Sequence, residues 1–101
     1  IWGAVDNAAQ GAVTALELAG VENTIVVSAG AWGSEAFNMI NDGNKYYKMC
    51  IGVSPANIVK LSLESVEAYF EGKEVPKAQN IELSVIDGTN IADFMKYVPA
   101  T

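Results

Sequence analysis

Residues 24–43 read TIVVSAGAWGSEAFNMINDG, and this stretch decides the fold class. Its first six residues are mostly apolar and β-branched and do not alternate with polar ones, as in a parallel strand covered on both faces. Residues 30–33 follow as a glycine-containing loop. Ser34 can then cap a helix whose apolar residues recur at helical spacing until Gly43. The stretch therefore predicts a strand followed by a helix.

The residues before this stretch predict the same succession. An apolar start runs into Asp6, and a helix of small residues follows and ends at Gly20. Asp6 stands where an N-cap is expected, with its carboxylate able to accept from the backbone N–H groups of Ala8 or Ala9. Residues 1–43 thus predict one and a half βα units, and such units build doubly wound parallel sheets of the Rossmann-like kind.

The residues after Gly43 continue the alternation. Residues 46–53 predict a third strand, and Ser54 is a cap that Pro55 follows at the first helical position. The helix predicted over residues 55–71 is the longest and has a broad apolar face. A polar connector leads to residues 81–86, which alternate like a half-exposed edge strand, and to a short C-terminal helix that Asn90 could cap. The expected order is βαβαβαβα, without an internal linker.

The composition excludes several classes of function. The 101 residues include 12 acidic side chains, six lysines and no arginine, for a net charge of −6. A phosphate-binding face normally needs basic residues, so we expect no nucleic-acid partner. Histidine is absent and Cys50 is the only cysteine, which excludes zinc-ligand clusters, paired redox cysteines and His-assisted nucleophiles. We therefore expect no metal, no cofactor and no catalytic residues.

Three segments together resemble type I periplasmic sugar-binding proteins, the ribose-binding-protein-like solute-binding proteins of ABC transporters. They are residues 6–20, which read DNAAQGAVTALELAG, residues 25–43, and the Pro55 helix with its ending EGKEVP at residues 71–76. The similarity extends over the whole chain and corresponds to about the last third of such a protein. It implies a partial α/β fold of this type, in which two Rossmann-like lobes joined by three crossings close on a small polar ligand.

The resemblance also implies a division of the chain. Residues 1–53 would form part of the C-terminal lobe, residues 54–80 a hinge crossing and a helix of the N-terminal lobe, and residues 81–101 a returning strand and the C-terminal helix. The ligand cleft of such folds lies at the carboxyl ends of the parallel strands. The ligand-binding residues expected there are Asp6, Ala31, Trp32 and Ser54, although capping is the favoured role of Asp6 and Ser54.

The expected cleft departs from the family pattern. Sugar-binding members typically have an Asn before the Asp of the first helix, an Asp after the second strand and a Gln or Asn after the third. This chain has Val5, Ala31 and Val53 or Ser54 there. Because an unpaired buried hydroxyl costs about 1 to 3 kcal/mol, these replacements argue against an ordinary hexose or pentose. Trp32 offers a flat stacking surface for a nucleoside, an aromatic compound or a less hydroxylated sugar derivative, or else packs against the neighbouring helix.

The resemblance implies the solute-binding component of an ABC-type importer, which is not an enzyme. Its expected ligand is a small sugar or a sugar-like or nucleoside molecule, its expected partner is a transporter permease, and its expected location is the periplasm or the cell surface as a lipoprotein. We also expect this chain to self-associate when it is isolated, because the apolar face of the Pro55 helix would lack a partner.

Two alternatives belong to other classes of protein. One is the effector-binding domain of a lac-repressor-like transcription regulator. Such regulators usually carry a proline-containing loop where this chain has residues 41–47, NDGNKYY. The other is a small flavodoxin-like or Rossmann-like enzyme, which the missing histidine, nucleotide fingerprint and carboxylate cluster disfavour.

Overall fold

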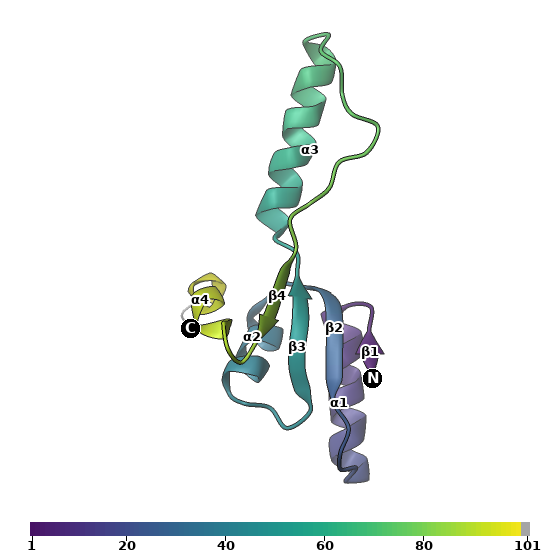
Figure 1. Ribbon diagram of the computed structural model, residues 1–101, viewed down its shortest axis with the longest axis vertical. Helices are drawn as coiled ribbons and strands as arrows, with labels where there is room; N and C mark the ends of the chain where they lie inside the picture. The colour runs from purple at the N-terminus through teal and green to yellow at the C-terminus, as the bar shows by residue number, and fades with distance from the viewer. Residues whose placement is uncertain (100–101) are drawn as a thin grey trace.

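The computed structural model describes residues 1–99 and confirms the predicted order of strands and helices (Figure 1). Four strands and four helices alternate, and a 3₁₀ turn follows the last helix. Their bounds are β1 Trp2–Gly3, α1 Asp6–Ala19, β2 Val26–Ala31, α2 Ser34–Asn41, β3 Tyr47–Gly52, α3 Pro55–Phe70, β4 Ser84–Asp87, α4 Ile91–Phe94 and η1 Met95–Tyr97.

The strands form one sheet in the order β1-β2-β3-β4. β1 and β3 both pair with β2 in parallel, as expected, whereas β4 pairs with β3 antiparallel. β4 begins beside the end of β3, as the pairing of Ser84 with Gly52 shows. The chain leaves the sheet into α3 at this end and comes back at the same end. The predicted edge strand is therefore confirmed at the edge, although it starts at Ser84 rather than at residue 81.

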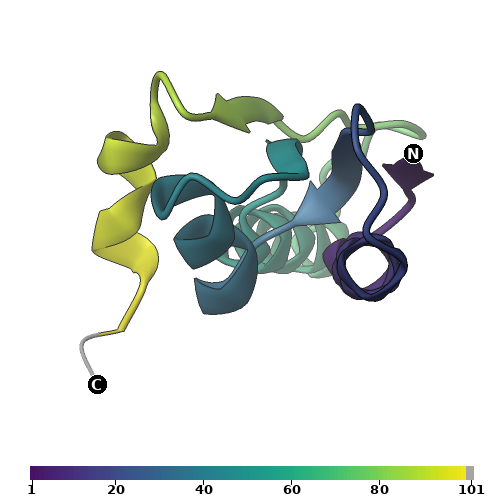
Figure 2. The same ribbon diagram turned by 90° about the horizontal axis from the view of Figure 1, so that it is seen from below.

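Helices α1 and α2 lie on the same face of the sheet (Figure 2). Both βα units step across the sheet in the same direction, and right-handed crossovers then put both helices on one side. Burial alternates accordingly: Cys50 and Ile86 are fully buried under the helices, whereas Trp2 and Val85 on the other face are more than half exposed. Among the described residues, the expectation that β2 is covered on both faces is therefore wrong.

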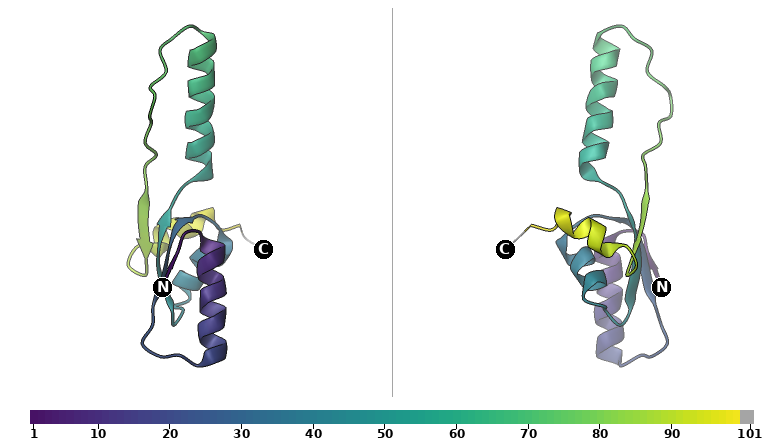
Figure 3. Two further views of the ribbon diagram at one scale, coloured as in Figure 1. Left: turned by 90° about the vertical axis from the view of Figure 1, so that its right-hand side faces the viewer. Right: turned by 60° about the vertical axis from the view of Figure 1, so that its left-hand side comes forward.

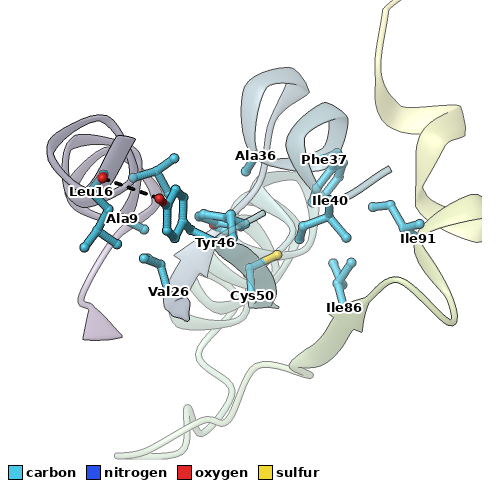
Figure 4. Packing of buried hydrophobic residues seen from close by; sticks show 13 residues of the cluster. Ala9, Leu16, Val26, Ala36, Phe37, Ile40, Tyr46, Cys50, Ile86 and Ile91 are labelled. Carbon is cyan, nitrogen blue, oxygen red and sulfur yellow. Dashed lines mark hydrogen bonds between the residues drawn. The ribbon is translucent and has the colours of Figure 1, made fainter. Parts of the chain in front are cut away.

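The core lies between the sheet and these two helices (Figure 4). Phe37 and Ile40 of α2 face Ile86 of β4, and Ile91 closes that side of the cluster. Three buried hydroxyls find partners: Ser28 Oγ lies 2.6 Å from Tyr47 Oη, and Tyr46 Oη donates to the carbonyl of Val21 at 2.7 Å. Among the described residues, no buried side-chain N or O atom lacks a partner.

The ends of the helices confirm some of the predicted caps. Gly20 ends α1 with φ +65°, and Ser54 Oγ accepts from the backbone N–H of Asn57 at 3.4 Å. Asp6 and Ser34, however, are the first helical residues, and Val5 and Gly33 occupy the N-cap positions. Asp6 Oδ1 accepts from the N–H of Asn7 instead, so its carboxylate acts on the positive end of the helix as a charge in the first turn.

Helix α3 projects from the sheet as an arm (Figure 3). None of its residues is buried, and its apolar side chains Leu63, Val66 and Phe70 are 64%, 52% and 81% exposed. The connector that returns to β4 runs along it, and Gln79 Nε2 donates to Ser65 Oγ at 2.9 Å. The arm gives the Cα trace a radius of gyration of 16.8 Å, against about 13 Å for a compact domain of this length.

The buried thiol and phenol of β3 predict a loss of stability at alkaline pH. Burial, with a smaller contribution from Asp6, raises the pKa of Cys50 from 9.0 to about 11. Burial raises the pKa of Tyr47 from 10.0 to about 12. The unfolded chain therefore loses these protons first, and each group lowers the free energy of unfolding by up to about 1.4 kcal/mol per pH unit between its two pKa values. Urea denaturation from about pH 8 to about pH 11 under reducing conditions measures this slope. The double variant Cys50→Ala, Tyr47→Phe should flatten it, and an unchanged slope in that variant would contradict the assignment.

Candidate functional site

The carboxyl ends of the parallel strands meet at one edge of the sheet, and β4 begins at that same edge. Ala31 pairs with Gly52, Gly52 pairs with Ser84, and the N–H of Val53 donates to the carbonyl of Ala31 at 3.2 Å. The loops after β2 and β3 therefore lie beside the residues that lead into β4. Ligands of open α/β sheets bind at such an edge.

A cavity of about 280 Å³ lies at this edge, and we call it the edge pocket. It draws residues from the loop after β2, the start of α3, the start of β4 and the C-terminal helices. Its lining consists of Trp32, Gly52, Ser54, Ala56, Asn57, Glu82, Ser84, Phe94 and Tyr97. Aromatic rings therefore share one pocket with hydroxyl, amide and carboxylate groups, a composition typical of small-molecule sites.

Two of the four expected ligand-binding residues line the edge pocket, namely Trp32 and Ser54. Asp6 lies outside its lining, at the start of α1. Ala31 is fully buried within β2, so its side chain faces the core and not the surface. The sequence predicts site residues at the ends of β1, β2 and β3, and the pocket includes only those that follow β2 and β3.

Sequence reasoning missed the other polar residues of the pocket, Asn57, Glu82 and Ser84. The sequence pattern predicts Asn57 within a helix and residues 82 and 84 within an alternating strand, and neither pattern indicates a ligand contact. Asn57 lies at the strand end because α3 begins directly after β3, whereas Glu82 and Ser84 lie there because β4 turns back antiparallel beside β3. One sequence signal could have indicated that these segments meet: the two predicted strands, residues 46–53 and 81–86, are separated by a single helix and its connector.

Trp32 packs against aromatic rings of this chain. Its ring centroid lies 4.9 Å from that of Tyr97, 5.4 Å from that of Phe37 and 6.3 Å from that of Phe94. The contacts to Phe37 and Phe94 are edge-to-face, which is a favourable geometry for aromatic pairs. The expectation that Trp32 packs against the neighbouring helix is therefore confirmed, and the same residue still forms a wall of the edge pocket.

Gly52, at the end of β3, is the lining residue where β4 packs most closely against β3. A Cβ atom on Gly52 would lie 2.6 Å from Ile86 Cδ1 and 3.5 Å from the Trp32 ring. Glycine at this position thus allows a core side chain and the indole to reach the backbone of β3 from the same side.

The remaining observations bear on chemistry. Within residues 1–99, no group of three or more His, Cys, Asp or Glu side chains is arranged to hold a metal ion. No helix of that part of the chain combines the length and the apolar character that crossing a membrane requires. Two further cavities, of about 300 and 160 Å³, lie between α3 and its connector and have no lining residue from the parallel strands.

The aromatic contacts predict that Trp32 stabilises the fold as well as lining the pocket. Trp32→Ala removes a half-buried indole that touches α2 and the C-terminal helices, and we expect it to cost about 2 to 4 kcal/mol. Trp2→Ala is the matched control, because Trp2 is 66% exposed and should cost much less. Urea denaturation of both variants measures the difference, and an equal cost would show that the aromatic contacts add nothing.

The comparisons with known proteins agree with this architecture. No protein-family model and no curated protein matches the chain. Among solved structures, it is similar to an ABC transporter periplasmic solute-binding protein from Actinobacillus succinogenes with bound D-allose, at a TM-score of 0.82 and 26% identity. That match covers 93% of this chain and 32% of the other.

A second solved structure has the same fold, an ABC transporter solute-binding protein from Agrobacterium vitis bound to α-D-tagatopyranose. Its TM-score is 0.79 at 20% identity, over 99% of this chain and 34% of the other. The chain therefore spans about a third of the length of the solved structures that it matches. Both are solute-binding proteins, and neither favours the regulator as an alternative. The resemblance found in the sequence is thus confirmed: the chain has, in partial form, the α/β fold of the periplasmic solute-binding proteins of ABC transporters.

Proposed function

We propose that this chain is the C-terminal part of a non-enzymatic solute-binding protein that delivers a small sugar, or a sugar-like or nucleoside ligand, to an ABC-type importer. The observation that carries the proposal is the edge pocket, which joins Trp32 to the polar groups of Ser54, Asn57 and Ser84 at the ends of β2 and β3. The sugars bound to the two similar solved structures support this ligand class.

The chemistry of the pocket suits a molecule with one apolar and one hydroxylated side. Aromatic rings of Trp32 and Tyr97 offer apolar surface to the C–H face of a sugar or to a base. The hydroxyl of Ser84 and the amide of Asn57 can both donate and accept, which satisfies ligand hydroxyls of either orientation. Asp6 remains a candidate contact at the neighbouring strand end, and Ala31 one only through its backbone.

The proposed mechanism is closure of two lobes on the ligand. Residues 1–53 would supply one wall of the cleft, residues 54–80 would cross the hinge into the other lobe, and residues 81–101 would return. A ligand that contacts both walls stabilises only the closed arrangement and thereby shifts the population toward it. Recognition of the closed form by a permease, outside the cytoplasm, completes the proposed role.

This mechanism predicts that residues 1–101 alone bind no small ligand measurably, because one wall of the cleft is missing. A polypeptide extended to the length of the solved relatives should bind at least one of D-allose, D-tagatose and adenosine in isothermal titration calorimetry. In that longer protein, Trp32→Ala should weaken binding, whereas Leu18→Ala, at an 85% exposed position on α1, should not.

Two results would count against this account. Micromolar binding by residues 1–101 alone would contradict the two-wall mechanism. Tight hexose binding that survives Trp32→Ala would overturn the role given to the indole.

We also propose that the isolated chain self-associates through the apolar face of α3. The chain exposes 6775 Å², roughly 1,300 Å² more than the surface expected of a compact monomer of 10.7 kDa. A standard interface buries about 800 Å² on each partner, so the excess is large enough for one. Part of this exposed surface is the apolar face of α3, where Val59, Leu63, Val66 and Phe70 are all more than half exposed.

Sedimentation velocity tests this proposal, with dimers or larger species expected at micromolar concentration. Leu63→Gln should shift the distribution toward monomer, because it removes apolar area without disturbing the core, to which α3 contributes no buried residue. Glu67→Gln on the same helix is the matched control. A monodisperse monomer of the unmodified chain would overturn the proposal.

A further inference from the structure

Glu82 gives the edge pocket its charge. Among the described residues that line the pocket it is the one charged side chain, and no lysine stands beside it in that lining. Glu82 also lines an adjoining cavity of about 300 Å³, which shares Asn57 with the edge pocket and continues between α3 and its connector. Its position just before β4 thus sets it where the two cavities meet.

The Glu82 carboxylate has no partner within residues 1–99. The ion pairs of that part of the chain are Lys45 with Glu22 and Lys73 with Glu71, and no hydrogen bond there ends on the Glu82 side chain. Lys60, which lines the adjoining cavity, forms no ion pair in the same residues. The carboxylate is therefore free to accept from a ligand.

The aromatic walls act in the same direction as this carboxylate. The face of Trp32 carries the negative side of the ring quadrupole and attracts cations, and Tyr97 shows the same attraction, because Lys96 Nζ lies 5.1 Å from its ring centroid. The chain as a whole has a net charge of −6, which adds a repulsive field for anions at low salt. The carboxylate of Glu82 and the ring faces therefore favour positive charge in the pocket, against the opposing field of the N-terminal end of α3, which supplies Ser54 and Asn57 to the lining.

We propose that the edge pocket selects amine-bearing sugars over anionic ones and that Glu82 is the residue that determines this preference. The ligand ammonium donates to the Glu82 carboxylate while the sugar ring lies against the aromatic wall. This inference rests on the proposed sugar-binding function and adds to it the charge class of the ligand.

The test uses the longer, two-lobed polypeptide and three probes of similar size: D-glucosamine, D-allose and D-glucuronate. Calorimetry at slightly acidic pH, where the amine is protonated, should rank their affinities in that order. A charge-assisted hydrogen bond predicts at least a tenfold preference for the amino sugar over the uronate. Since Glu82 is exposed to solvent, the preference should shrink in high salt.

Glu82→Gln should reduce the ratio of the affinities for D-glucosamine and D-glucuronate to about threefold or less. Glu82→Lys should reverse the preference. Glu74→Gln is the matched control, because Glu74 lies on the same connector but outside the lining of the edge pocket. It should leave the ratio unchanged.

The outcomes separate the inference from the function on which it rests. Binding of D-allose with equal affinities for glucosamine and glucuronate would overturn the role of Glu82 and leave the proposed function standing. An unchanged ratio in Glu82→Gln would do the same. Binding of none of the three sugars would overturn the inference, and the proposed function would fall with it if adenosine also failed to bind.

Discussion

The close approach of Ile86 to the backbone of Gly52 is the constraint on which the site depends. A methyl group at position 52 would lie 2.6 Å from Ile86 Cδ1, so a larger residue there would require the buried Ile86 side chain to shift. Ile86 is fully buried and packs under α2, and pairing with Gly52 holds Ser84 at the end of β3, with Glu82 two residues before it. One glycine thus links the packing of the core to the position of the polar groups in the edge pocket.

The parts of the fold that sequence reasoning found correctly are those with local signals. Gly20 ends α1 because a residue there adopts a positive φ, and Ser54 with Pro55 begins α3 through a cap and a fixed φ. The starts of α1 and α2 were misplaced by one residue, because Asp6 and Ser34 favour both the cap and the first turn of a helix. Here the local chemistry of the two positions is too similar to separate them.

The parts that sequence reasoning missed depend on long-range pairing. Nothing in residues 81–87 specifies the direction of β4, since an alternating edge strand pairs in either orientation. The pocket residues Asn57, Glu82 and Tyr97 come from three segments that meet only after β4 has paired and α4 has packed on α2. Trp32 was recognised because it directly follows a strong strand signal, which is the position where open α/β sheets bind their ligands.

The paired ends of β3 and β4 also determine how the α3 arm can move. The arm is joined to the sheet by two neighbouring chain segments, after Gly52 and before Ser84, and these two residues pair with each other. A two-stranded ribbon bends out of its plane more readily than within it, so the arm should rock about a single axis along the sheet edge instead of swivelling. Asn57 in the first turn of α3 and Glu82 before β4 both lie on the arm side of this pair, so such rocking carries both residues together. The polar side of the pocket would then travel as one unit, while the aromatic side stays with the sheet.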